Sequence, residues 1–242
     1  MKRSIQFFLI SVLATSASFG GAFTVCSTGF ATATTSGCGA AIVSPGGNNL
    51  TADGNWYVAS SSSGTMLSQA FVTVNNYYPV GPINPGINPW LANDSNSSWV
   101  TPGNNQVTQY PTGQYYYGQQ FAIANTTQAN SARISGFWLA DDYGTGVFLN
   151  GISVAQTSLP VFGGLGGPLV AFSISNGGVG QAQFQAGTNR LVFGVMNNTD
   201  SNGNTVTGFR VQISNADVPE PGSILLLGAG LAGLAFARRQ SR

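Results

Sequence analysis

Short apolar runs recur along this chain, and they restrict what it can fold into. Each run is rich in β-branched and aromatic residues, and clusters of Gly, Asn, Pro or Ser separate it from the next. No helical period longer than two turns occurs outside the two ends. This pattern is typical of an all-β sandwich or barrel. We expect strands at residues 56–59, 70–74, 115–124, 133–140, 146–155, 169–175, 180–185, 190–196 and 208–214.

Two of these segments alternate clearly between apolar and polar positions. Leu191, Phe193 and Val195 fall on one face of their strand. In the last expected strand, apolar residues alternate with Arg210 and Gln212. Successive side chains of a strand point to opposite faces, so each of these strands is expected to bury one face and to expose the other.

A tight turn is predicted between residues 147–149 and 152–154. The two residues that separate these apolar runs are Asn150 and Gly151. Asn-Gly is favoured in two-residue hairpin loops because both positions need a positive φ angle. We therefore expect a β-hairpin here.

The N-terminal end differs from the rest of the chain. A basic start is followed by a short apolar run, 5–14, and then by small residues, with cleavage expected after Ala17 or Ala22. This order predicts a secretory signal peptide over residues 1–22. The alternative is an uncleaved N-terminal anchor, which the shortness of the apolar run disfavours.

The C-terminal end holds a second apolar run, 224–237, which follows a Pro-Glu-Pro-Gly turn and stops at a cluster of arginines. As a helix it would span ~21 Å, against ~30 Å for the hydrocarbon core of a bilayer, so it is short for a permanent anchor. The arginines favour the cytoplasmic side, which leaves the bulk of the chain outside. The alternative is an amphipathic helix packed on the domain, but the run is apolar on every face.

These C-terminal residues resemble the PEP-CTERM sorting signal of Gram-negative bacteria that make extracellular polysaccharide. The resemblance implies recognition by an exosortase, transient anchoring in the inner membrane, processing near the Pro-Glu-Pro, and export to the cell surface or biofilm matrix. It divides the chain into a signal peptide (1–22), an ectodomain (23–217) and a sorting tail (218–242). The residues that it assigns to sorting and processing are Val218, Pro219, Glu220, Pro221, Gly222, Arg238 and Arg239.

The ectodomain carries little charge. Its only basic residues are Arg133, Arg190 and Arg210, against six aspartates. Binding to nucleic acid or to anionic membranes needs clustered Lys and Arg, so this composition argues against both. Aromatic and β-branched residues are plentiful, and they supply enough apolar area to offset the entropy lost on folding.

Residues 115–214 resemble a β-sandwich module of secreted bacterial proteins with this kind of tail. The match rests on Gly136 and Trp138 in one strand, the Asn-Gly hairpin, and the segments 186–198 and 207–214. Such modules resemble galactose-binding-like jelly rolls. The resemblance therefore implies a jelly-roll or β-sandwich domain. This chain has Asp142 where Asn is commoner in the module.

Cys26 and Cys38 are the only cysteines, and both follow the signal peptide. In an oxidising compartment they are expected to form a disulfide that closes a short loop, worth roughly 2 to 4 kcal/mol. A metal site would need more ligands, and the chain contains no histidine.

Asp141 and Asp142 are adjacent carboxylates at the end of an expected strand. Neighbouring side chains in a strand point to opposite sides, so an acid and base pair facing one substrate is not expected. One hypothesis is a structural Ca²⁺ site with carboxylate and carbonyl oxygens from residues 141–146. The other, which we favour, is an Asx-type turn that opens the hairpin.

Sugar binding needs flat aromatic faces for the C–H side of the ring, together with amides and carboxylates for the hydroxyls. The candidate glycan contacts are Trp90, Trp99 and Tyr116, which lie among Pro, Asn and Gly. Aromatic residues in a β domain also serve as core or loop packing, and this alternative stays open.

The residue inventory argues against an enzyme. Without histidine there is no Ser-His or Cys-His pair, and the only lysine, Lys2, lies in the expected signal peptide. Glycoside hydrolysis stays formally open through pairs of aspartates. The sequence therefore favours an exported, non-catalytic protein of the surface or biofilm matrix with weak binding to extracellular polysaccharide. The alternatives are a purely structural matrix protein and a glycan-active hydrolase.

Overall fold

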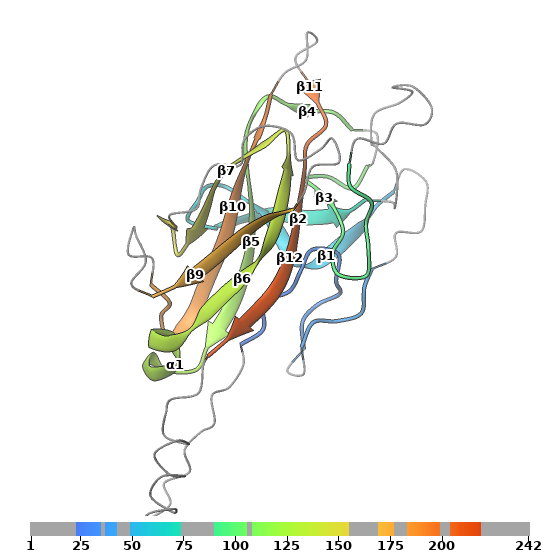
Figure 1. Cartoon of the computed structure of the whole chain (residues 1–242). Coiled ribbons are helices and arrows are strands. Elements are labelled where there is room, and N and C mark those ends of the chain that lie inside the picture. Colours follow the sequence, from blue (N-terminus) through green and yellow to red (C-terminus); the bar gives the residue numbers. More distant parts are fainter. Residues whose placement is uncertain are drawn as a thin grey trace, which may run out of the picture. The chain divides into compact units, whose positions relative to one another are not determined.

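A computed structural model describes residues 23–34, 37–42, 49–73, 90–105, 108–154, 169–176, 183–198 and 204–218 (Figure 1). They fall within one compact unit, Ala22–Pro219. The predicted signal peptide and the predicted apolar helix of the tail lie outside the described residues. Within the described ranges, no helix is long and apolar enough to cross a membrane.

The described part of the chain is nearly all β. One antiparallel sheet has the strand order β8-β7-β10-β5-β1-β2-β3-β12-β6-β9, and β4 and β11 pair separately. The prediction of an all-β fold is confirmed. The elements are β1 (Thr51–Ala59), β2 (Met66–Val72), β3 (Val100–Thr101), β4 (Tyr110–Pro111), β5 (Gly113–Ile123), α1 (Thr126–Ser131), β6 (Arg133–Asp141), β7 (Tyr143–Leu149), β8 (Ile152–Ser153), β9 (Val170–Ser175), β10 (Gly187–Asn197), β11 (Asn204–Thr205) and β12 (Gly208–Asp217).

The sheet folds back on itself, so that its two halves share one core (Figure 1). The ring of Phe193 on β10 lies 5.0 Å from that of Trp138 on β6 and 5.2 Å from that of Phe172 on β9. Trp56 on β1 lies 5.2 Å from Phe209 on β12. This layering is compatible with the predicted β-sandwich. The galactose-binding-like jelly roll is not confirmed and stays a prediction.

Strand alternation places the core residues of β10 as expected. Leu191, Phe193 and Val195 are fully buried. Val192 is also fully buried, although it belongs to the opposite face. A side chain at Gly64 would come within 2.9 Å of Val192, so the turn after β1 lies directly over this position. Packing outside the sheet therefore buries part of its second face.

The predicted Asn-Gly hairpin is confirmed between β7 and β8. Asn150 and Gly151 have φ angles of 53° and 83°, and Leu149 pairs with Ile152. The Asn150 side chain also accepts a hydrogen bond from the backbone N–H of Arg190 at 2.9 Å. The hairpin is thus tied to β10 as well as closed by its own turn.

Two local features differ from the predicted strands. The expected strand 180–185 is not one over its described residues, 183–185, because the N–H of Phe184 donates to the side chain of Asn176 instead of to a neighbouring strand. The six-residue α1 has too few turns to show a helical period. It is capped by Asn125, whose side chain accepts from the N–H of Gln128 at 2.9 Å.

Candidate functional site

Residues 90–99, which we call the cap segment, cross the second face of the sheet. Trp90 and Trp99 stack on each other with ring centroids 4.4 Å apart, and they pack with Leu139 and Val206 in a small apolar cluster. Their exposed fractions are 4% and 1%. Both rings therefore act as loop packing, the alternative that the sequence left open, and neither offers a face to a glycan in this structure.

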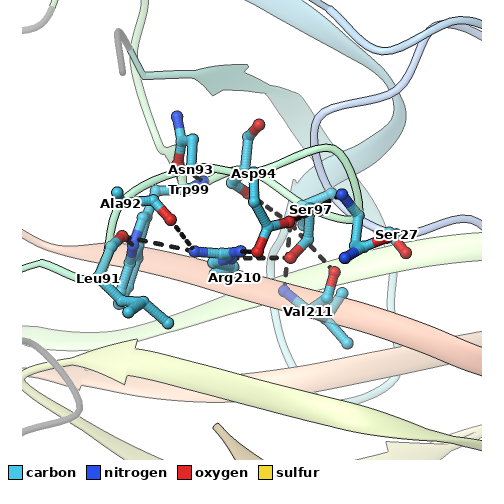
Figure 2. Close-up of polar contacts among 12 residues, drawn as sticks. Ser27, Leu91, Ala92, Asn93, Asp94, Ser97, Trp99, Arg210 and Val211 are labelled. Atoms are coloured by element: carbon cyan, nitrogen blue, oxygen red, sulfur yellow. Dashed lines mark hydrogen bonds and ion pairs between the residues drawn. The ribbon is translucent and has the colours of Figure 1, made fainter. Parts of the chain in front are cut away.

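Arg210 on β12 holds the cap segment in place, as Figure 2 shows. Its Nε donates to the Ser97 hydroxyl at 2.7 Å, and its Nη1 donates to the carbonyl oxygens of Ala92 at 2.6 Å and Leu91 at 3.4 Å. Its Nη2 lies 2.7 Å from the Asp94 carboxylate. Alternation predicted an exposed position for Arg210, but its side chain is fully buried because the cap segment covers it.

The charges of this cluster balance each other. Partial burial pushes the pKa of Asp94 upward, but the N–H of Asn96, the Arg210 charge and the N–H of Ser97 outweigh it, so the pKa is lowered. Burial lowers the pKa of Arg210, against the attraction of Asp94. A guanidinium stays protonated in proteins, so the cluster is a compensated ion pair that fixes a loop.

Asp141 and Asp142 lie closer together than strand alternation predicted. Asp141 ends β6 and is 5% exposed, and the Trp90 indole N–H donates to it at 2.8 Å. Asp142 accepts from the N–H of Asn198 at 2.5 Å. The two carboxyl groups lie close enough to hydrogen-bond when one of them holds a proton, and the peptide bond between them is cis. The predicted opposite orientation is corrected because Asp142 stands beyond the strand, where alternation no longer applies.

Burial is the main electrostatic influence on this carboxyl pair. It raises the pKa of Asp141 to about 7, opposed by the Trp90 hydrogen bond and reinforced by the neighbouring Asp142 charge. Burial also raises the pKa of Asp142. Two carboxyl groups in contact favour sharing one proton. Within the described ranges no three His, Cys, Asp or Glu side chains gather as a metal site, and the Ca²⁺ hypothesis stays a prediction.

A second buried carboxylate is that of Asp53, which no sequence motif marks. It accepts hydrogen bonds from the N–H groups of Gly29 at 2.6 Å, Asn55 at 2.8 Å and Trp56 at 2.9 Å. Burial raises its pKa to about 6 against these three donors. Asp53 therefore joins the chain segment before β1 to the start of that strand.

The predicted disulfide between Cys26 and Cys38 is confirmed. Cys26 is also held by its backbone, since its N–H donates to the Gln119 side chain at 2.9 Å and its carbonyl accepts from the Trp56 indole at 2.9 Å. The N-terminal segment, residues 23–42, is thus fixed to β1 and β5 where the structure describes it.

A pocket of about 390 Å³ opens where the N-terminal segment meets β1, β2 and β5. Tyr57 and Met66 add apolar surface to the pocket, and none of its described lining residues is charged. No motif marks these residues, because they are neutral and are scattered along the sequence. The polar lining residues are Thr24, Thr32, Asn55, Gln69, Gln119 and Gln120.

Tyr116, the third candidate glycan contact, is half-buried on β5. Its ring meets the edge of the Phe148 ring at a centroid distance of 6.2 Å. It is not among the pocket lining, and it is not in the cluster of Trp90 and Trp99. The structure therefore does not bring the three predicted aromatic contacts together.

Of the predicted sorting residues, the structure describes Val218, which is buried in the main core. The other six, Pro219, Glu220, Pro221, Gly222, Arg238 and Arg239, lie outside the described residues. The folded domain thus extends to the first residue of the predicted tail.

Comparison with protein families identifies this tail. Residues 217–240 match the model of the PEP-CTERM protein-sorting motif. The PEP-CTERM motif supports an exported protein that an exosortase recognises and processes at the membrane. A search of curated proteins and a search of solved structures gave no match.

Proposed function

We propose that an exosortase processes this protein and delivers it to the cell surface or the polysaccharide matrix, where its β domain contacts glycan weakly and without catalysis. The observation that carries the proposal is the PEP-CTERM motif at residues 217–240, directly after a disulfide-bonded β domain. The disulfide fits an oxidising compartment outside the cytoplasm.

The position of Val218 supports processing that leaves the domain intact. Val218 packs into the main core, and the Pro-Glu-Pro begins at the next residue. Cleavage after Val218 would therefore remove no residue of the described domain. Release into a matrix requires a domain that stays folded without its tail.

The environments of four described aspartates support a non-catalytic role. Glycosidases hold two carboxyl groups roughly 5 to 9.5 Å apart on either side of the scissile bond. Asp141 and Asp142 instead lie within hydrogen-bonding range of each other, and Asp141 also accepts a hydrogen bond from the Trp90 indole. Asp53 is bonded to three backbone N–H groups, and Asp94 is paired with Arg210.

Glycan contact is favoured over a purely structural role by one feature, the uncharged pocket lined with amides and hydroxyls. Side chains of this kind match the donors and acceptors of sugar hydroxyls. A purely structural protein has no need of such a pocket, and it is the second candidate function.

The first test is the intact mass of the protein recovered from the surface of cells that make it. We expect a mass that lacks the first ~20 residues and the tail after the Pro-Glu-Pro. A mass that retains the tail would instead indicate a membrane-tethered protein and would refute release into the matrix. A chain truncated before Val218 should fail to reach the surface in normal amount.

Glycan contact is tested separately by co-sedimentation of the processed protein with purified extracellular polysaccharide. We expect retention that soluble polysaccharide competes away. Release of reducing sugar from that polysaccharide, abolished by an Asp→Asn substitution, would favour the hydrolase alternative. Equal recovery with and without polysaccharide would favour the purely structural one.

A further inference from the structure

The pocket beside the N-terminal segment has a floor made of neighbouring strands. Tyr57 on β1 pairs with Gln69 on β2 and with Gly118 on β5. A side chain at Gly118 would come within 2.8 Å of the Tyr57 ring, so the ring lies over this glycine. The Tyr57 hydroxyl donates to the carbonyl of Gly64 at 2.9 Å. The position of the Tyr57 ring is therefore fixed by its packing on Gly118 and by the hydrogen bond of its hydroxyl.

The walls of the pocket are also ordered by the fold. The Asn55 side chain donates to the carbonyls of Phe30 and Ala31 at 3.1 and 2.9 Å, and it accepts from the N–H of Ala33 at 2.7 Å. The Gln119 side chain accepts from the N–H of Cys26. These two hydrogen-bonded amides position the N-terminal segment against β1 and β5. A preformed wall lowers the entropy cost of binding a ligand.

Two other amides are available to a ligand. Gln69 and Gln120 lie in the lining and are exposed. The Gln120 side chain lies within hydrogen-bonding range of the Tyr57 hydroxyl, but an amide has more than one donor and acceptor, so its remaining polar groups and those of Gln69 can exchange water for ligand hydroxyls. Met66 is 49% exposed and provides apolar surface next to them. The pocket thus combines amide donors and acceptors with a small apolar patch, as in sites for amphipathic small molecules.

The charge of the lining selects among ligands. Carboxylates and phosphates lose hydration on entering a pocket and need a cationic partner in return. Among the described residues that line this pocket there is no Arg or Lys, and there is no Asp or Glu to hold a cation. The ligand is therefore expected to be uncharged. Hydroxyls suit amides because each amide offers both donors and an acceptor.

From these observations we infer that this pocket binds a neutral sugar unit of a polysaccharide, with Gln69 and Gln120 on its hydroxyls and Met66 against its C–H face. The inference rests on the proposed function and gives that function a site other than the predicted aromatic residues. The volume of about 390 Å³ lies at the lower end of the ~300 to 1,000 Å³ typical of ligand pockets, which suits one or two sugar units.

The test is a saturation-transfer NMR titration of the full-length chain in a zwitterionic detergent. The probes are two neutral disaccharides, cellobiose and lactose, and one charged disaccharide that contains glucuronic acid. The pocket variant is Gln69→Met with Gln120→Met, which keeps side-chain length and removes both amides at exposed positions. The matched control is Gln109→Met, which changes an exposed glutamine outside the lining.

We expect at least one neutral disaccharide to bind at millimolar concentration and to bind at least tenfold more weakly to the pocket variant. The Gln109→Met control should bind like the wild type, and each single pocket variant should show a partial loss. An unchanged thermal unfolding midpoint checks that the variants stay folded.

Equal affinity of the pocket variant and the control would overturn the pocket assignment while leaving the proposed glycan contact in place. Preference for the charged disaccharide would also overturn it. If neither neutral disaccharide binds to the wild type, the pocket inference fails, and the proposed glycan contact is then decided by the co-sedimentation with polysaccharide.

Discussion

The cap segment and the amide-lined pocket both lie on the second face of the sheet. The side chains under the cap segment are shielded from solvent, whereas the pocket is open to it. Under the cap segment, Arg210 is fully buried and paired with Asp94, while Trp90 and Trp99 stack on each other. The pocket holds only neutral polar groups beside Tyr57 and Met66, and several of these groups stay exposed.

The difference shows how charge determines which region can receive a ligand. A buried guanidinium must be fully paired, so the cap segment has to close around Arg210. A neutral amide has a much smaller desolvation penalty than a guanidinium. It can therefore line an open pocket without being fully hydrogen-bonded by the protein. Trp90 and Trp99, two of the three predicted glycan contacts, are therefore used for packing, whereas unmarked glutamines line the open site.

The largest expected effect comes from removing the charge under the cap segment. Arg210→Met leaves Asp94, Ser97 and two carbonyl groups without their partner and should lower the free energy of unfolding by about 3 to 5 kcal/mol. Urea unfolding at pH 7 measures this. Arg133→Met, at an exposed position, is the control and should change stability by no more than about 0.5 kcal/mol. A loss below about 1 kcal/mol for Arg210→Met would mean that the cluster is not a clamp.

The disulfide should affect both stability and the pocket. Replacing Cys26 and Cys38 by serine removes the cross-link of the N-terminal segment and should cost about 2 to 4 kcal/mol. Because Thr24 and Thr32 of this segment line the pocket, disaccharide affinity should fall as well. Wild-type protein treated with a reductant should match the variant. Lost stability with unchanged affinity would show that the disulfide does not organise the pocket wall.

Stability should fall as the pH rises through the weakly acidic range to neutrality, because of the carboxyl pair next to Trp90. Burial raises the pKa of Asp141 to about 7 in the folded state, against about 4 in an unfolded chain. The folded protein thus keeps a proton that the unfolded chain loses. The stabilisation is complete below pH 4 and is lost through pH 7, so unfolding at pH 5 should cost roughly 1 to 3 kcal/mol more than at pH 8.

Asp141→Asn is the control for this pH dependence. The amide stays neutral and can still accept from the Trp90 indole, so the difference between pH 5 and pH 8 should shrink by at least half. The remainder comes from Asp53, whose pKa burial raises to about 6, and from Asp142, whose pKa burial also raises. Disaccharide affinity should be constant over the same range, because no carboxylate lines the pocket. An equal pH dependence in the variant would contradict the assignment.

The smallest effect is expected from Trp90→Phe. This substitution keeps the stacked ring on Trp99 and removes the hydrogen bond to Asp141, for a loss of about 1 to 2 kcal/mol. Polysaccharide retention and disaccharide affinity should not change. Loss of retention in a stable Trp90→Phe protein would restore the predicted glycan contact at Trp90.

Local patterns were sufficient for much of the fold. The Asn150-Gly151 turn and the buried face of β10 depend on backbone preference and strand period, which are properties of neighbouring residues. Strand alternation wrongly predicted an exposed side chain at Arg210, because a segment more than a hundred residues earlier in the sequence covers it. It failed at Asp142 because the strand had already ended.

The sequence by itself determined the all-β class, the disulfide and the PEP-CTERM motif of the tail, since each is carried by residue type and local order. Only the tertiary structure decided which polar and aromatic side chains are open to a ligand. Trp99 and Arg210 are buried, whereas Gln69 and Gln120 are exposed to solvent. The reason is that segments distant in the sequence cover one part of the sheet and leave another accessible. Burial is a property of such long-range packing, and no short pattern of residues records it.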